Sequence, residues 1–303
     1  LIIPSFSPEN KPLGYKSAIT ANAAMDIAAA KDIVRMYIDM ESGLKEKGYK
    51  DRVKEAKLLG EQLPEYQFDK NGAIREWSMK EYKENNAHRH ISHLYCAWPS
   101  YQTQHDDILS AACRQAIVNR NRENTGKDDT ASHGWIHKAL VEARLKNSES
   151  VYDILNLLVH SDIFYTSLFT DHNTNRAKGV ACTDTLFGIA GIVNEMLVYS
   201  DRSTIELFPA LSSRIPKGKV CGLMTRAGVR IDSLEWCINT GTEGLKTDMK
   251  DGFYIKLKIT ALRDTEFGLI LKNESFNEMS KEDKSLFNQN IKLKSGEEYA
   301  ILL

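Results

Sequence analysis

The positions of the prolines constrain the fold of this chain more than any other feature of its sequence. The seven prolines stand at positions 4, 8, 12, 64, 99, 209 and 216, so residues 101–208 lack the strongest helix breaker. Apolar residues recur at helical spacing within that stretch and before it. The sequence therefore predicts a succession of amphipathic helices, at residues 21–40, 51–63, 104–121, 132–146, 148–160 and 186–200.

After Pro209 the apolar residues alternate with polar ones, which is the pattern of strands. Ile255, Leu257 and Ile259 are separated by single polar residues, and glycines punctuate the region at intervals typical of short antiparallel strands. Shorter alternations follow at residues 269–271, 291–293 and 299–303. We therefore expect a mainly α protein with a β-rich C-terminus, divided into a helical domain over residues 1–205 and a β-rich domain over residues 206–303.

The composition excludes several classes of protein. Forty Lys and Arg against forty-one Asp and Glu leave a net charge of -1, so there is no basic excess to bind the phosphates of nucleic acid. No apolar run is long enough to predict a membrane span. The five cysteines form no C-x-x-C pair, which argues against a disulfide framework and a thiolate zinc site. Residues 1–7 lack the features of a signal peptide, and the compartment stays open.

The histidines are concentrated in one region. All eight lie between His88 and His172, and the densest group is the run His-Arg-His-Ile-Ser-His at residues 88–93. Three interpretations remain open for this run. Its imidazoles could bind zinc, although no carboxylate ligand interrupts it. Ser92 could cap a helix, or Arg89 and a neutral imidazole could donate hydrogen bonds to the hydroxyl groups of a sugar.

Two carboxylates are candidates for acid and base chemistry. Glu76 directly precedes Trp77, and a carboxyl group beside apolar surface has a raised pKa, which suits a general acid. Asp184 stands just before a predicted helix. Facing each other across a cleft at about 6.5–9.5 Å, two carboxylates would form the apparatus of an inverting glycosidase. The simpler alternatives are a surface Glu76 beside a core tryptophan and an Asp184 that caps its helix.

Several segments, taken in order, resemble glycoside hydrolase family 95. They span about residues 1–230, and the run His-Arg-His-Ile-Ser-His-Leu-Tyr is the most specific. The others are Pro-Ser-Phe-Ser-Pro-Glu-Asn at 4–10, Ala-Met-Asp at 24–26, Ile-Arg-Glu-Trp at 74–77, Gly-Trp at 134–135, Ala-Arg-Leu at 143–145, Asp184 with Glu-Met-Leu at 195–197, and Glu-Leu-Phe-Pro-Ala-Leu at 206–211. The resemblance implies an inverting, exo-acting α-L-fucosidase or α-L-galactosidase without a metal or other cofactor. It also implies part of an (α/α)6 barrel followed by an antiparallel, β-sandwich-like domain.

The resemblance assigns roles to particular residues. Glu76 would be the general acid, and Asp184 would support the base that activates water. Arg89, His90 and Trp77 would bind the sugar. The residues around Asp184, Ala-Cys-Thr before it and Thr-Leu after it, depart from the family pattern.

The partner implied by the resemblance is a fucosylated or galactosylated glycan. The alternative is a relative that binds carbohydrate without hydrolysing it. A twelve-helix barrel with a sheet domain needs more than 303 residues. We therefore expect an additional N-terminal portion or a homodimer to cover the open half of the barrel. By resemblance, the location would be periplasmic or secreted.

Overall fold

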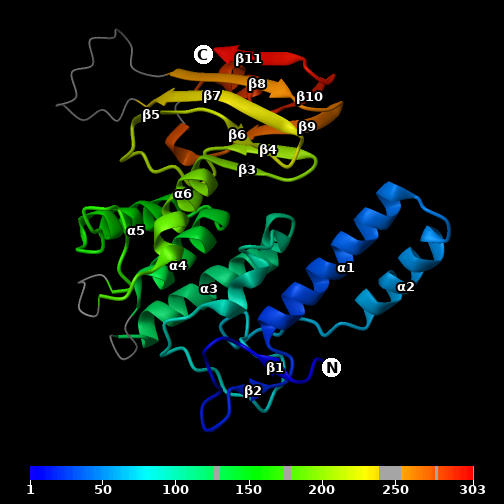
Figure 1. Cartoon of the computed structure of the whole chain (residues 1–303), viewed down its shortest axis with the longest axis vertical. Coiled ribbons are helices and arrows are strands. Elements are labelled where there is room, and N and C mark those ends of the chain that lie inside the picture. The colour runs from blue at the N-terminus through cyan, green and yellow to red at the C-terminus, as the bar shows by residue number, and fades with distance from the viewer. Residues whose placement is uncertain (126–129, 174–178, 239–253, 277–278, 303) are drawn as a thin grey trace. The chain divides into compact units, whose positions relative to one another are not determined.

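The order of structural elements follows the prediction, with helices first and a β-rich C-terminus after them (Figure 1). The computed structural model describes residues 1–125, 130–173, 179–238, 254–276 and 279–302. The chain divides into two compact units, Leu1–Val141 and Glu142–Leu303. The domain boundary placed after residue 205 stays a prediction.

The first unit is built from helices joined by long connections. Its helices pack around buried apolar side chains that include Ile27, Trp77 and Leu94. Its elements are β1 Ser5–Phe6, β2 Ile19–Thr20, α1 Ala24–Leu44, α2 Tyr49–Glu61, the 3-10 turns η1 Ser92–Cys96 and η2 Gln102–Gln104, α3 Asp107–Glu123 and most of α4 Ser132–Arg144. The helices predicted at 21–40, 51–63, 104–121 and 132–146 are therefore confirmed.

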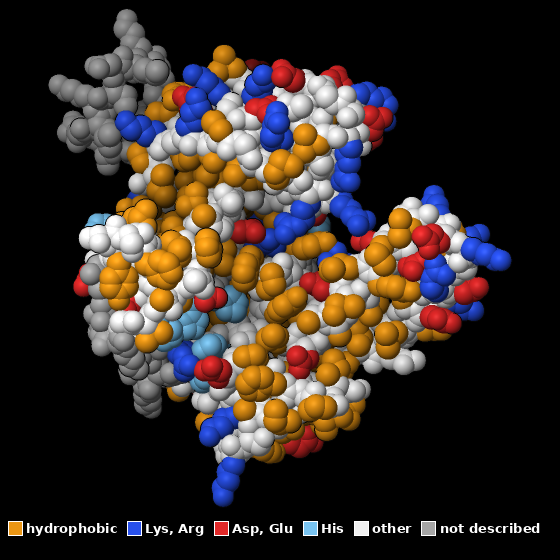
Figure 2. Space-filling view, viewed as in Figure 1, with side chains coloured by type: hydrophobic (Ala, Val, Ile, Leu, Met, Phe, Trp, Pro, Cys, Tyr) orange, Lys and Arg blue, Asp and Glu red, His pale blue; other side chains and the backbone are white. Residues whose placement is uncertain are grey.

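Helix α1 carries an apolar stripe that its own unit leaves exposed. Ile33, Met36, Met40 and Leu44 follow one another at spacings of three and four residues, and each is more than half exposed. Hydrophobic side chains along this helix are visible in Figure 2. Exposed apolar side chains in a continuous row often mark a surface that contacts another protein.

The second unit begins with two helices and continues as two sheets. Helix α5 spans Ser148–His160, as predicted, and α6 spans Thr183–Leu197. One sheet has the order β10-β9-β4-β3, and the other has the order β11-β8-β7-β5 with β6 paired to β7. The strands are β3 Val198–Ser200, β4 Thr204–Leu207, β5 Lys217–Val220, β6 Leu223–Met224, β7 Val229–Cys237, β8 Tyr254–Ala261, β9 Thr265–Leu271, β10 Gln289–Leu293 and β11 Glu298–Leu302, with η3 Glu274–Phe276 and α7 Lys281–Leu286 after β9.

One pairing corrects the expectation of a purely antiparallel domain. Strands β4 and β9 run parallel, with Ile205 opposite Leu269, whereas the other strand pairs of this unit are antiparallel in the part that the structure describes. The chain between β4 and β9 contributes β5, β6, β7 and β8 to the five-stranded sheet. This long connection allows a parallel pairing that a tight hairpin cannot make.

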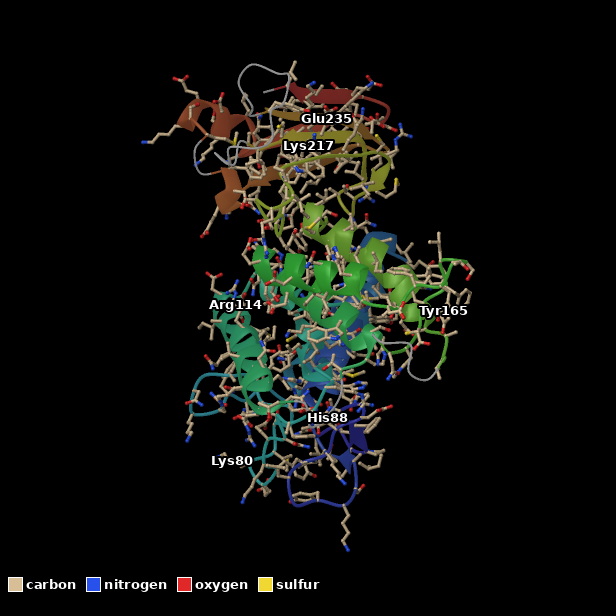
Figure 3. The ribbon with its side chains drawn as sticks, turned by 90° about the vertical axis from the view of Figure 1, so that its left-hand side faces the viewer. Lys80, His88, Arg114, Tyr165, Lys217 and Glu235 are labelled. Atoms are coloured by element: carbon tan, nitrogen blue, oxygen red, sulfur yellow. The ribbon has the colours of Figure 1, made fainter. Side chains whose placement is uncertain are left out.

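Strand β8 buries alternate residues. Ile255, Leu257 and Ile259 of β8 are buried while the residues between them are exposed, as their alternation predicts. Phe208, which follows β4, contacts the Trp236 ring of β7 at a centroid distance of 5.4 Å and therefore joins the two sheets. Figure 3 labels Lys217 and Glu235 on the neighbouring strands β5 and β7.

The end of α6 differs from the prediction of a helix over residues 186–200. The helix ends at Leu197, and Val198–Ser200 forms β3, because these residues pair with β4 through Val198 opposite Leu207. The β-branched and aromatic residues Val198 and Tyr199 suit a strand once a partner strand is present. Among the described residues, no helix is both long enough and apolar enough to cross a membrane.

Candidate active site

The segment Ser7–Asn10 lies at the centre of the candidate site. The Ser7 hydroxyl donates to Oε1 of Glu76 and the Asn10 amide donates to Oε2, each at 2.6 Å. Between them, Glu9 accepts a hydrogen bond from Arg89 at 2.5 Å and lies 3.8 Å from Nε2 of His90. These four residues therefore contact both the candidate acid and the histidine-rich run.

Ser92 strengthens this connection and does not cap a helix. Its hydroxyl donates to the carbonyl oxygen of Pro8 at 2.6 Å. The N-cap residue of η1 is Ile91, whose side chain makes no capping hydrogen bond. The capping interpretation of Ser92 is therefore wrong, because its hydroxyl binds the backbone of a distant segment instead.

Glu76 is buried as one half of an ion pair. Nη2 of Arg120 donates to its Oε2 at 2.6 Å, and the side chains of Arg120 and Glu76 are only 4% and 2% exposed. The backbone holds Glu76 in place, since its carbonyl accepts the N–H of Ala24 and its neighbour Trp77 bridges to Ala23. The interpretation of Glu76 as a surface residue is therefore wrong. A buried carboxylate is stable only with such partners.

Arg120 has no role in the sequence prediction, although the sequence contains a signal for it. The buried face of α3 includes Cys113, Ala116 and Ile117, and Arg120 continues that face at the helical spacing. A charged residue on an apolar helix face implies a buried partner. Besides Glu76, Arg120 donates to the carbonyl of Asn85, and among the described residues its Nε finds no acceptor.

A second carboxyl group, that of Glu84, contacts the backbone of Glu76. Oε2 of Glu84 accepts the backbone N–H of Glu76 at 2.9 Å, and its Oε1 accepts a hydrogen bond from Arg75 at 3.2 Å. Burial raises the pKa of Glu84 to about 7, although the hydrogen bond from the Glu76 backbone favours its charged form. The position of Glu84 could not be read from spacing, because a loop folds back to bring it there.

Trp77 is fully buried. Its ring packs edge to face on Tyr82 at a centroid distance of 6.4 Å, and its Nε1 has no acceptor in the part of the chain that the structure describes. Its role as a sugar contact stays a prediction.

The histidine run meets further histidines from α4. His90 lies 5.3 Å from His88 and 5.7 Å from His133, measured between ring centroids, and Figure 2 shows several histidine side chains gathered in one region. Burial lowers the pKa of His93 well below its usual value and that of His137 to about 4. In the described part of the chain, no group of three or more His, Cys, Asp or Glu side chains is arranged to hold a metal ion.

A cavity of about 190 Å³ adjoins the ion pair and the histidine run. Arg89 and Arg120 both line it, and so does His88, which is labelled in Figure 3. Its lining combines cationic, amide and aromatic side chains, which suits hydroxyl groups and a sugar ring face. The remaining lining residues are Ile91, Ile117, Asn121, Asn124, Thr130, Gly134, Trp135 and Lys138.

Asp184 belongs to the second unit, whereas Glu76 belongs to the first. It is exposed and lies in the first turn of α6, where a negative charge interacts favourably with the helix dipole. The residue at the N-cap is Cys182, whose side chain makes no capping hydrogen bond. The interpretation of Asp184 as a cap is therefore wrong.

Comparisons with known proteins place the chain in a family. Residues 1–197 match the glycosyl hydrolase family 95 catalytic domain. This match covers more than half of the chain and includes Glu76, Arg89, His90 and Asp184. The chain belongs to this family of glycosidases.

Curated relatives of the chain carry fucosidase names. Alpha-L-fucosidase 2 from Arabidopsis thaliana is 32% identical over 251 residues, which are 77% of this chain and 28% of that protein. Probable alpha-fucosidase A from Aspergillus oryzae is 29% identical over 53% of this chain and 25% of that protein. The corresponding protein from Aspergillus niger is 27% identical over 59% of this chain and 24% of its own length. The chain thus spans about a quarter of the length of these relatives.

Proposed function

We propose that this chain is the C-terminal catalytic portion of an inverting, exo-acting glycosidase that removes terminal α-L-fucose, or α-L-galactose, from a glycan. The observation that carries the proposal is the segment Ser7–Asn10, which contacts Glu76 through its ends and Arg89 through Glu9. A candidate acid and candidate sugar-binding side chains are thereby held around one short segment. The family match and the fucosidase names of the relatives support the choice of reaction and sugar.

In this proposal Glu76 is the general acid. It protonates the oxygen of the glycosidic bond as that bond breaks, while water attacks the opposite face of the sugar ring. Asp184 supports the base that takes the proton from this water. An inverting mechanism requires the two carboxyl groups to be about 6.5–9.5 Å apart, which leaves room for the water molecule.

Arg89, His90 and Trp77 are the proposed sugar contacts. Glu9 holds the Arg89 guanidinium through an ion pair at 2.5 Å, which orients its remaining N–H groups. Guanidinium and imidazole N–H groups are donors suited to sugar hydroxyls. Trp77 is proposed as an apolar wall of the sugar site.

The proposal also includes an architecture for the two units and a covering surface for α1. We infer that the helices form part of an (α/α)6 barrel within residues 1–205 and that residues 206–303 form a β-sandwich-like domain. The exposed stripe of α1 is then a surface that an additional N-terminal portion, or a second copy of the chain, covers. No nucleic acid or membrane partner is part of the proposal.

The test is hydrolysis of an α-L-fucoside by the parent chain and by Glu76→Gln. The amide keeps the shape of the side chain but cannot supply the proton, so we expect turnover of an unactivated fucoside to fall by a factor on the order of 10²–10⁴. Glu195→Gln is the matched control, since Glu195 is also ion-paired to a buried arginine, Arg144, but lies in the second unit.

Two results would contradict the proposal. Equal activity of Glu76→Gln and the parent would remove Glu76 from the reaction. Binding of fucose by both proteins without any hydrolysis would favour the alternative, a relative that binds carbohydrate only.

A further inference from the structure

The two carboxyl oxygens of Glu76 have chemically different partners. Oε2 accepts hydrogen bonds from the Asn10 amide and the Arg120 guanidinium, both at 2.6 Å. Oε1 accepts its hydrogen bond from the Ser7 hydroxyl, also at 2.6 Å. Ser7, Asn10 and Glu76 are all buried, so these protein groups and not bulk water are the hydrogen-bond partners of the carboxylate.

The orientation of the Asn10 amide is fixed by its other hydrogen bonds. Its Oδ1 accepts the backbone N–H of Lys11 and the side-chain amide of Asn85, each at 2.9 Å. Its Nδ2 also donates to the carbonyl of Asn85 at 3.0 Å. A flipped amide would lose these bonds, so the group that faces Glu76 is the NH₂.

These partners decide which oxygen can carry a proton. An amide NH₂ and a guanidinium have only donors, so a proton on Oε2 would face two N–H groups and no acceptor. A serine hydroxyl both donates and accepts. When Glu76 is protonated, the proton therefore fits on Oε1, with the Ser7 oxygen as its acceptor.

We propose that Ser7 is a positioning residue for the acid of the reaction: its hydroxyl makes Oε1 the oxygen of Glu76 that holds the transferable proton, while Asn10 and Arg120 hold Oε2. This inference rests on the proposed role of Glu76 as general acid. It assigns Ser7 a role that composition and spacing did not give it.

The reaction step is balanced as follows. The Oε1–H bond of Glu76 breaks and its proton joins the glycosidic oxygen, while the bond from that oxygen to the anomeric carbon breaks and leaves its electron pair on the oxygen. A water molecule forms the new bond to the anomeric carbon, and its proton goes to the base. Glu76 is left ionised and accepts hydrogen bonds from Ser7, Asn10 and Arg120, the three partners that contact it in the structure.

The experiment compares two substrates that differ in their need for an acid. Fluoride leaves α-L-fucosyl fluoride with little help from a proton, whereas the sugar that leaves a fucosylated disaccharide needs one. We expect Ser7→Ala to lose about tenfold in kcat/KM on the disaccharide, the equivalent of one hydrogen bond, and much less on the fluoride. Ser7→Thr, which keeps a hydroxyl, should recover part of the loss.

Ser5→Ala is the matched control. Ser5 is also buried and lies two residues before Ser7, in β1, but its hydroxyl donates to Asp26 at 2.5 Å instead of Glu76. If Ser5→Ala only disturbs the local structure, kcat/KM should therefore fall by the same factor on both substrates. Thermal unfolding of each variant checks that it is folded.

Each outcome separates this inference from the proposed function. Equal losses on both substrates in Ser7→Ala, with a selective loss on the disaccharide in Glu76→Gln, would overturn the role of Ser7 alone. Equal losses in Glu76→Gln would overturn Glu76 as the acid. A parent chain that hydrolyses neither substrate would overturn both.

Discussion

Replacing Arg120 by methionine should strongly destabilise the first unit. Methionine fills much of the same volume but leaves the Glu76 carboxylate, only 2% exposed, without its cation. The change also removes the hydrogen bond to the carbonyl of Asn85. Breaking a buried ion pair by removing one partner costs about 3–5 kcal/mol. Urea-induced unfolding of the 303-residue chain, followed by far-ultraviolet circular dichroism, measures this change in the free energy of unfolding.

The same helix provides the control for this measurement. Arg122 pairs with Glu123 at 2.8 Å, but these side chains are 56% and 40% exposed, so Arg122→Met should cost at most about 1 kcal/mol. Adding Glu76→Gln to Arg120→Met should recover part of the stability, since the buried charge is then gone. Equal, small costs for Arg120→Met and Arg122→Met would refute the argument that the Arg120–Glu76 pair is buried and essential to the fold.

Two further predictions concern pH. Burial raises the pKa of Glu84 to about 7 from a usual 4.5. Its contribution to stability is therefore fully present below about pH 4.5 and is lost as the pH rises through about 7. Glu84→Gln should remove this loss of stability, as measured by urea unfolding across that pH range. Burial lowers the pKa of His137 to about 4 from 6.5, so its contribution is present above about pH 6.5 and is lost as the pH falls through about 4. His137→Gln should therefore lose less stability than the parent between pH 6.5 and 4, and a parallel loss in both proteins would contradict the assignment.

Local periodicity predicted the helices and most strands, because each of these elements depends on residues that are close together in sequence. The helix Ser148–His160 has the predicted bounds, and the alternation of Ile255, Leu257 and Ile259 matches β8. The parallel pairing of β4 with β9 could not be predicted from periodicity. Periodicity indicates which face of a strand is buried but not which strand lies beside it.

The site was partly predictable for the same reason. Short motifs singled out Glu76, Arg89 and His90, and the structure joins them through Ser7–Asn10. Arg120 was missed as a partner of Glu76 because it lies on a helix, 44 residues further along the chain. The position of Arg120 on the buried face of α3 was the sequence signal for a buried partner. Short motifs do not include this signal, because it depends on the periodicity of a whole helix.

The most direct test of the account is proton NMR of an α-L-fucoside during hydrolysis by this chain, with Glu76→Gln in parallel. An inverting enzyme releases the sugar with the opposite anomeric configuration, so the account predicts that β-fucose appears first with the parent and that the variant releases almost none. Initial release of α-fucose, or equal release by the variant, would contradict the central claim that this chain inverts its substrate with Glu76 as the acid.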